Sequence, residues 1–144
     1  MRAQSKNLRE RGANLVEFAI LAPLLVMLVL GIIDFAWILS THQDVRHGAR
    51  EAARLAAVST DNEVAMAGLV CNAMNFSVGA TITFSGGGGD IGDTGTVTVV
   101  SPVSSLTGFS SLPFAGAIYP TTFTESIDFR LEQPASWSNG GATC

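Results

Sequence analysis

Charged side chains are scarce in this chain. Of its 144 residues, 8 are Lys or Arg and 12 are Asp or Glu, so that 14% carry charge while 47% are hydrophobic. Cations are scarcest after Ser59, where Arg130 is the single Lys or Arg. The acidic residues of that part are Asp61, Glu63, Asp90, Asp93, Glu125, Asp128 and Glu132. A nucleic-acid-binding domain carries a basic patch or stripe, so this composition excludes one and instead fits a chain that includes a membrane span.

Histidine is also scarce, which limits catalytic and metal chemistry. His42 and His47 are the two histidines, and they lie five positions apart without a glutamate between them, unlike the ligands of an H-E-x-x-H zinc motif. A Ser-His-Asp site would have to use one of them, and nothing else in the sequence supports such a site. We therefore expect no enzyme activity, no metal, no cofactor and no small-molecule substrate.

A glycine-rich stretch suggests two further sites that its context argues against. Gly87, Gly89 and Gly92 match G-x-G-x-x-G, but a dinucleotide fingerprint needs a helix to follow, and a β-rich stretch follows here. Asp90 and Asp93 are two carboxylates in one loop, fewer oxygen ligands than a calcium site requires. The stretch is therefore interpreted as a hairpin loop.

One long apolar run dominates the first third of the chain. From Phe18 to Ile33 no residue is ionisable, and an extension to Leu39 is interrupted only by Asp34. Its length, roughly 20 residues, is what a helix needs to cross the hydrocarbon core of a bilayer. Pro23 would kink or break a soluble helix, whereas a membrane helix tolerates proline. We predict a transmembrane helix over residues 13–39.

The charges before this run predict its orientation. Four basic residues outweigh Glu10 there, namely Arg2, Lys6, Arg9 and Arg11. The positive-inside rule therefore places the N-terminus in the cytoplasm and everything after Leu39 outside. An ordinary secretory signal peptide is the main alternative, but its apolar region is shorter and ends in a small-residue cleavage site that this sequence lacks. We expect the helix to be retained as a single-pass anchor in the cytoplasmic (inner) membrane.

A glycine and a glutamate mark the start of the predicted helix. Glu17 is a carboxylate at the edge of an apolar span, where charge is costly and normally marks a partner or a function. It follows Gly12, which ends the basic stretch, and lies between Val16 and Phe18. This spacing resembles the class III, prepilin-type signal, in which a membrane peptidase cuts after the glycine and the glutamate becomes the fifth residue of the mature chain.

The longer pattern resembles the TadE-like family of the tight adherence (Tad) pilus system. It is made of the stretch Arg11 to Ala19, Pro23, the stretch Gly31 to Phe35 and the Ala- and Arg-rich stretch Gly48 to Val58. The resemblance covers about a third of the chain. It implies a minor pilin or pseudopilin that takes part in assembly of a Tad-type pilus and is not its main subunit.

The same resemblance implies roles for individual residues. Prepilin peptidase would cut between Gly12 and Ala13 and remove the leader, residues 1–12. Glu17 would then pair with the new amine of Ala13 and set subunit register, with Phe18 and Pro23 in the same assembly segment. The implied partners are that peptidase, other pilins and pilus-assembly proteins, and membrane lipid. The alternative is an unprocessed, single-pass anchored protein that binds a ligand or serves adhesion or secretion.

Outside the membrane the sequence predicts a small α+β domain. The first helix continues over residues 40–58, where an apolar stripe recurs at helical spacing. The stripe consists of Val45, Ala49, Ala52, Ala53 and Ala56. Residues 59–144 follow and begin with a second helix, about Asp61 to Met74, which the capping-box pattern Thr60 to Glu63 introduces. The side of this helix expected to be apolar comprises Val64, Ala67, Val70, Cys71 and Met74.

Three strands are expected after the second helix. Alternation of apolar and polar residues predicts strands at Val78 to Phe84, Thr96 to Val100 and Phe123 to Leu131. The stretch Leu106 to Tyr119 is expected to be an irregular apolar connection, with a short helix before Pro113. The predicted architecture is thus pilin-like: a long helix against which a small antiparallel sheet packs.

The chain has two cysteines, and both lie on the predicted outer side. Cys71 falls on the second helix and Cys144 is the last residue. Disulfides form and persist in such compartments, and a domain this small benefits from one. A Cys71–Cys144 bridge would tie the tail at Gly140 and Gly141 to the domain and stabilise it by roughly 2 to 4 kcal/mol. Two unpaired thiols are the alternative.

Overall fold

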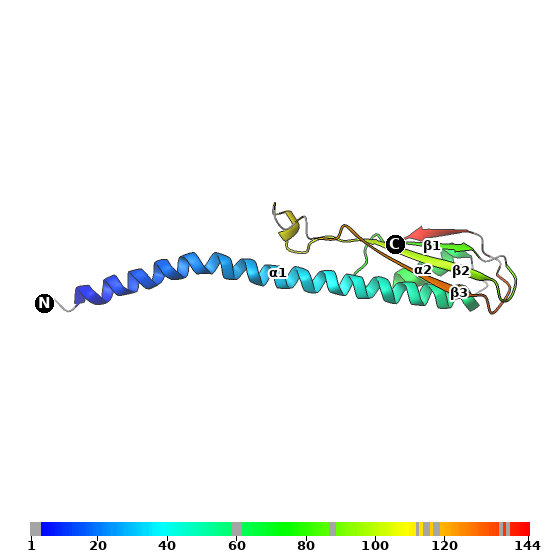
Figure 1. Ribbon diagram of the computed structural model, residues 1–144, viewed down its shortest axis with the longest axis horizontal. Helices are drawn as coiled ribbons and strands as arrows, with labels where there is room; N and C mark the ends of the chain where they lie inside the picture. Colours follow the sequence, from blue (N-terminus) through cyan, green and yellow to red (C-terminus); the bar gives the residue numbers. More distant parts are fainter. Residues whose placement is uncertain are drawn as a thin grey trace.

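The structure is a computed structural model of the whole chain. It describes the backbone of residues 4–58, 62–86, 89–111, 113, 116, 119–135, 137 and 139–144. Side chains are described from Gly12 onward within these ranges, apart from Phe109. Figure 1 shows a single long helix that projects from a small domain, with the two ends of the chain far apart.

Helix α1, Gln4–Val58, is 55 residues long and confirms the prediction of an unbroken helix that ends at Val58. At 1.5 Å per residue its length is about 82 Å. The helix continues through Pro23, as expected for a membrane helix, and curves over its N-terminal third (Figure 1). Only its C-terminal half belongs to the domain.

Helix α2, Glu63–Ala73, is shorter than predicted and begins with a different cap. Asn62 occupies the N-cap, and its side-chain oxygen accepts a hydrogen bond from the Ala65 amide at 2.8 Å. Asn ranks with Ser and Asp as a capping residue, which explains why the helix starts two residues later than the Thr60 pattern required. Thr60 and Asp61 themselves lie outside the described residues.

Four strands form one antiparallel sheet in the order β3-β2-β1-β4. They are β1 Thr81–Gly86, β2 Thr94–Pro102, β3 Thr122–Arg130 and β4 Gly140–Thr143. The first three correspond to the predicted strands, and the 3-10 helix η1, Phe109–Ser111, lies before Pro113 as expected. The small α+β class is therefore confirmed.

Strand β4 was missed, because its sequence Gly-Gly-Ala-Thr has no apolar alternation. It pairs with β1 along its whole length, from Phe84 opposite Gly140 to Thr81 opposite Thr143. Gly141 is required there, since a Cβ at this position would collide with the carbonyl of Ile82. The tail that we expected only the disulfide to tie to the domain is an edge strand.

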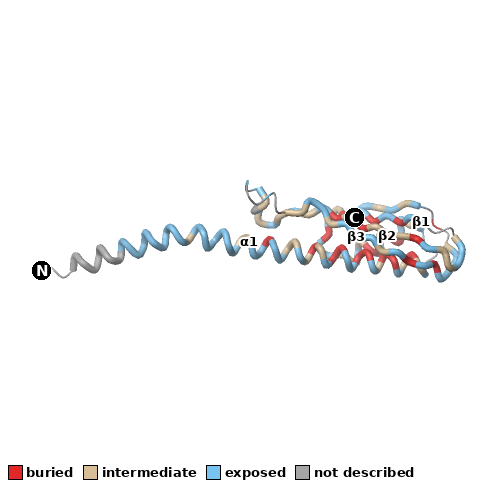
Figure 2. The backbone as a smooth tube through the Cα atoms, in the orientation of Figure 1, coloured by how far each residue is buried: buried red, intermediate tan, exposed pale blue. Residues whose placement is uncertain are grey.

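The hydrophobic core lies between the sheet and the two helices (Figure 2). The predicted stripe on α1, Val45, Ala49, Ala52, Ala53 and Ala56, is buried without exception. Gly48 lies on the same side, and a Cβ there would collide with the side chain of Met74, so glycine lets α1 and the end of α2 approach closely. Two assignments were wrong. Val64 on α2 and Val78 before β1 are exposed, while Met66 is buried instead.

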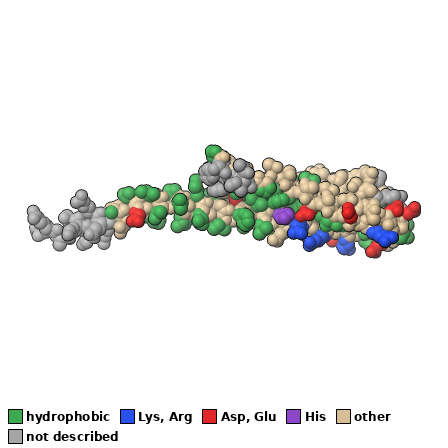
Figure 3. All heavy atoms as spheres, viewed as in Figure 1, with side chains coloured by type: hydrophobic (Ala, Val, Ile, Leu, Met, Phe, Trp, Pro, Cys, Tyr) green, Lys and Arg blue, Asp and Glu red, His purple; other side chains and the backbone are tan. Residues whose placement is uncertain are grey.

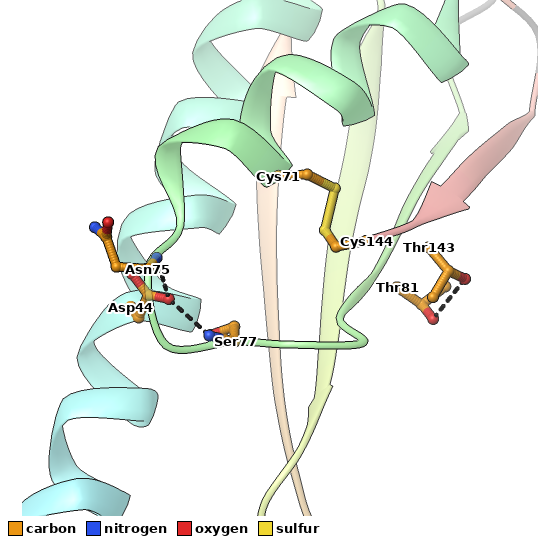
Figure 4. The surroundings of a disulfide bond; sticks show 7 residues. All are labelled: Asp44, Cys71, Asn75, Ser77, Thr81, Thr143 and Cys144. Atoms are coloured by element: carbon orange, nitrogen blue, oxygen red, sulfur yellow. Dashed lines mark hydrogen bonds between the residues drawn. A yellow bond between two sulfur atoms is a disulfide. The ribbon is translucent and has the colours of Figure 1, made fainter.

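The disulfide Cys71–Cys144 is formed, with a Cα–Cα distance of 5.4 Å. It joins α2 to the residue after β4 (Figure 4). The amide of Cys144 also donates to the Ala80 carbonyl at 2.7 Å, so the end of the chain is fixed by both a covalent bond and a hydrogen bond.

A long connection, residues 103–121, joins β2 to β3; we refer to it as the β2–β3 connection. Its base is closed by a hydrogen bond from the Val103 amide to the Thr121 carbonyl at 3.0 Å. From there it runs beside α1 toward the N-terminal half of the helix, away from the rest of the domain (Figure 1). The η1 turn within it contacts α1.

Candidate functional site

The N-terminal half of α1 is an apolar shaft that the chain's own fold does not cover. No residue from Gly12 to Ile33 is buried, and many large hydrophobic side chains are more than half exposed, for example Leu15, Phe18 and Ile20 at 68%, 68% and 71%. Green side chains cover this part of the helix in Figure 3. Exposed apolar surface on this scale marks contact with lipid or with other proteins. The shaft belongs to Gly12–Val58, the one candidate membrane span found in the described residues, which suggests a single-pass membrane anchor.

The residues predicted to guide processing and assembly lie at the start of this shaft. Gly12, Ala13, Glu17, Phe18 and Pro23 are all exposed. Within the described residues, Glu17 makes no hydrogen bond or ion pair. A Cβ added at Gly12 would meet nothing within 4 Å, so packing in this chain does not require a glycine there. The predicted processing and assembly roles would therefore involve another molecule or a change in the chain itself.

A second carboxylate on α1, that of Asp34, is fully buried by the β2–β3 connection. It accepts four hydrogen bonds: from the Ser105 hydroxyl at 2.5 Å, the Leu106 and Thr107 amides at 3.1 and 2.9 Å, and the Tyr119 hydroxyl at 3.1 Å. Hydrogen bonds to a charged acceptor are stronger than neutral ones. Burial raises the pKa of the Tyr119 phenol, and its bond to Asp34 raises it further. Asp34 thus anchors the connection to the helix.

A third carboxylate, that of Asp44, anchors the turn that follows α2. It accepts hydrogen bonds from the amides of Asn75, Phe76 and Ser77 at 3.0, 2.9 and 3.1 Å. Figure 4 shows Asp44 with Asn75 and Ser77. Successive amides that converge on one carboxylate form an anion-binding nest, and here the anion belongs to the same chain. Asp44 is buried and directly precedes Val45, the first residue of the apolar stripe.

Sequence reasoning missed both anchors. Asp34 attracted notice only as part of the family pattern and as an interruption of the apolar run, and Asp44 attracted none. A signal was present for Asp34, because an ionisable residue within a hydrophobic stretch normally has a partner. The partners come from residues about seventy positions later, and no spacing rule connects such distant segments.

Basic side chains on the outer part of α1 lie close to carboxylates. His42 Nε2 and Arg46 Nε lie 3.3 and 3.5 Å from the same oxygen of Glu125 on β3. Arg54 Nη2 lies 2.6 Å from Glu51, and this hydrogen bond lowers the pKa of the Glu51 carboxyl. Such exposed pairs contribute little to stability. Among the described residues, no group of three His, Cys, Asp or Glu side chains could hold a metal ion.

The glycine-rich loop is a connection between β1 and β2, because β2 and not a helix follows it. Gly87 lies outside the described residues. Gly92 donates its amide to the Leu131 carbonyl at 2.8 Å, and the carbonyl of Gly89 accepts from the Ala135 amide at 3.1 Å. The Asp93 side chain accepts a hydrogen bond from the Asp90 amide at 3.3 Å. The backbone of Gly89 and Gly92 therefore attaches the loop to the segment after β3, whereas the Asp93 side chain bonds within the loop itself.

Comparison with known proteins finds a family match that is confined to α1. The family model described as TadE-like protein matches residues 12–54. No curated protein and no solved structure matches this chain. The matched residues include Gly12, Glu17, Asp34, Asp44 and Gly48, and they end just before the last turn of α1. The resemblance inferred from the sequence is confirmed over that segment: the N-terminal helix of this chain is TadE-like, as in components associated with the Tad pilus.

Proposed function

We propose that this chain is a minor pilin, or pseudopilin, that is cleaved after Gly12 and takes part in assembly of a Tad-type pilus. One observation carries the proposal. The TadE-like segment begins at the predicted cleavage glycine, and its first half is an apolar shaft whose side chains serve no purpose within the chain's own fold. A shaft of this kind can be embedded in the membrane and later packed against other subunits.

The position of Glu17 supports a role in assembly. After cleavage, the amine of Ala13 would be four residues from Glu17, which places the two groups on one face of the helix about one turn apart. Each charge alone opposes burial in an apolar environment, whereas a close pair of opposite charges is favourable at low dielectric. The pairing can form within one subunit or between neighbours, and the latter would fix their register.

The proposal assigns each part of the chain a place. Residues 1–12 are the leader on the cytoplasmic side. Residues 13–39 cross the cytoplasmic membrane, including the headgroup layer on its outer side. Residues 40–58 and 59–144 lie outside, in a compartment where disulfides such as Cys71–Cys144 form and persist. The partners would be prepilin peptidase, other pilins, pilus-assembly proteins and membrane lipid.

The intact mass and N-terminal sequence of the protein from its native membranes test the proposal directly. A chain that begins at Ala13 is expected. A chain that retains Arg2 to Gly12 would instead identify an unprocessed anchored protein, and a chain that begins beyond Leu39 would identify an ordinary secreted domain. Either of these results would overturn the proposal.

Substitutions separate processing from assembly. Gly12→Leu should abolish cleavage without altering the folded domain, because a side chain at this position meets nothing in the structure. Glu17→Ala should leave cleavage and folding intact but reduce the number of pili seen by electron microscopy. Glu51→Ala is the matched control, since it also removes a carboxylate from α1 but on the domain side. Equal pilus counts in the Glu17→Ala and Glu51→Ala strains would contradict the assembly role of Glu17.

A further inference from the structure

We propose that the part of the β2–β3 connection held by Asp34, Ser105 to Thr107 together with Tyr119, is a membrane-contact element, which lies in the lipid headgroup layer beside the point where α1 leaves the hydrocarbon. The partner is the lipid surface itself. This inference rests on the proposed membrane insertion of α1, but it does not depend on cleavage or on pilus assembly. It is carried by the place where Asp34 holds the connection, and by the composition of the connection.

The axial position follows from helix geometry. The exposed apolar shaft from Gly12 to Ile33 is about 33 Å long, and the hydrocarbon core of a bilayer is about 30 Å thick. Asp34 is the next residue and the first on α1 to be fully buried by the domain. The carboxylate therefore lies where the hydrocarbon ends, and Leu106 and Thr107, whose amides it binds, lie at the same level.

Trp37 provides an independent marker of this level. It lies three residues beyond Asp34, about 4.5 Å further along the helix axis. The headgroup region adds roughly 5 to 8 Å on each side of the hydrocarbon, and tryptophan is enriched in that layer. Its ring is in edge-to-face contact with Phe76, at a centroid distance of 5.4 Å. Residues 34–39 would accordingly occupy the headgroup layer, so that the hydrocarbon part of the predicted span ends at Ile33.

The composition of the connection suits this environment. No charged residue occurs between Asp93 and Glu125, although the rest of the outer domain is acidic. Leu106 is 58% exposed, and Phe35, which follows Asp34 on the helix, is 67% exposed. Apolar side chains that are exposed at this level would be removed from water by contact with lipid, which is favourable. The absence of carboxylates also avoids repulsion from anionic headgroups.

Asp34 lowers the free-energy cost of placing the polar groups of the connection at this level, because it binds them. Backbone amides at the edge of the hydrocarbon that are shielded from water without a hydrogen-bond partner are costly. The amides of Leu106 and Thr107 and the hydroxyls of Ser105 and Tyr119 all point to the Asp34 carboxylate. The carboxylate in turn is shielded from lipid, because four donors surround it and its residue is fully buried.

Depth-dependent fluorescence quenching tests the proposal on the full chain in vesicles of phosphatidylcholine and phosphatidylglycerol. Both native cysteines are in the disulfide, so a single introduced cysteine can be labelled with an environment-sensitive dye. Leu106→Cys reports on the connection. Val78→Cys and Ile91→Cys are matched controls, because both side chains are exposed, at 83% and 68%, but Val78 lies in the stretch between α2 and β1 and Ile91 in the β1–β2 loop. Leu28→Cys reports on the shaft.

We expect nitroxide-labelled headgroups to quench the Leu106 label at least about threefold more than the Ile91 label, with Val78 between them. Equal quenching at Leu106 and Ile91, whether both weak or both strong, would overturn the proposal, since the connection would then be no closer to lipid than the distal loop. The Leu28 label distinguishes a wrong placement of the connection from a failure of α1 to insert into the membrane. If acyl-chain nitroxides quench it strongly, the anchor stands and only the placement of the connection is wrong. If they do not, the membrane insertion of α1 is itself wrong.

Discussion

Replacing Asp34 by alanine should release the β2–β3 connection from α1 without unfolding the domain. The substitution removes the acceptor of four hydrogen bonds. Each bond to a charged acceptor contributes about 1.5 to 3 kcal/mol net, or about 6 to 12 kcal/mol if the four are summed. Freeing Ser105, Leu106 and Thr107 returns about 1 to 2 kcal/mol of backbone entropy per residue. The lower limits leave a loss of about 3 kcal/mol for the local attachment.

Amide hydrogen exchange in detergent micelles measures this loss at the affected atoms. A change of about 3 kcal/mol corresponds to more than about 100-fold faster exchange. We expect that acceleration at the amides of Leu106 and Thr107 in Asp34→Ala, and a smaller one in Asp34→Asn, which keeps an oxygen acceptor but not its charge. The unfolding midpoint of the domain should change little, because the core packs on α1 only from Val45 onward.

Asp44→Ala is the matched control, since it removes a comparable buried carboxylate from the same helix. It should accelerate exchange at Asn75, Phe76 and Ser77, whose amides it binds, and leave the β2–β3 connection unaffected. Asp34→Ala should show the reverse pattern. Unchanged exchange at the amides of Leu106 and Thr107 in Asp34→Ala would refute the view that this carboxylate holds the connection in place.

Four further changes test the domain. Replacing Cys71 and Cys144 by serine should reduce the free energy of unfolding by roughly 2 to 4 kcal/mol in denaturant titrations, and an equal loss on reduction of the native chain is the internal check. Gly141→Ala should cost about 1 to 3 kcal/mol, because its Cβ would meet the backbone of β1. Gly68→Ala on α2, where a Cβ meets nothing, should instead stabilise by about 0.5 to 1 kcal/mol, so equal effects of the two changes would contradict the reasoning. Glu51→Gln should cost less than about 0.5 kcal/mol at pH 7. Since Arg54 lowers the pKa of Glu51, that stabilisation is present above the ordinary value of 4.5 and is lost as the pH falls below it, so the thermal midpoints of the two proteins should converge at low pH.

The sequence by itself determined the long helix and much of the domain. Uninterrupted apolar residues from Phe18 to Ile33 and the alanine stripe from Val45 to Ala56 are local patterns, and helical periodicity is a local property. The three longer strands follow from alternation in the same way. The Gly12 and Glu17 spacing was also visible, as was the resemblance that residues 12–54 confirm.

Only the tertiary structure decided how distant segments meet. Strand β4 exists because Gly141 fits closely against the backbone of Ile82, and nothing in its own sequence predicts a strand. The exposure of Val78, which alternation assigned to the core, depends on where β1 begins in the sheet. Asp34 looked like a minor interruption of an apolar run, yet it binds four donors from residues more than seventy positions away. A hydrogen-bonding partner is chosen by distance in space, and spacing along the chain carries no information about it once a long connection turns back on the helix.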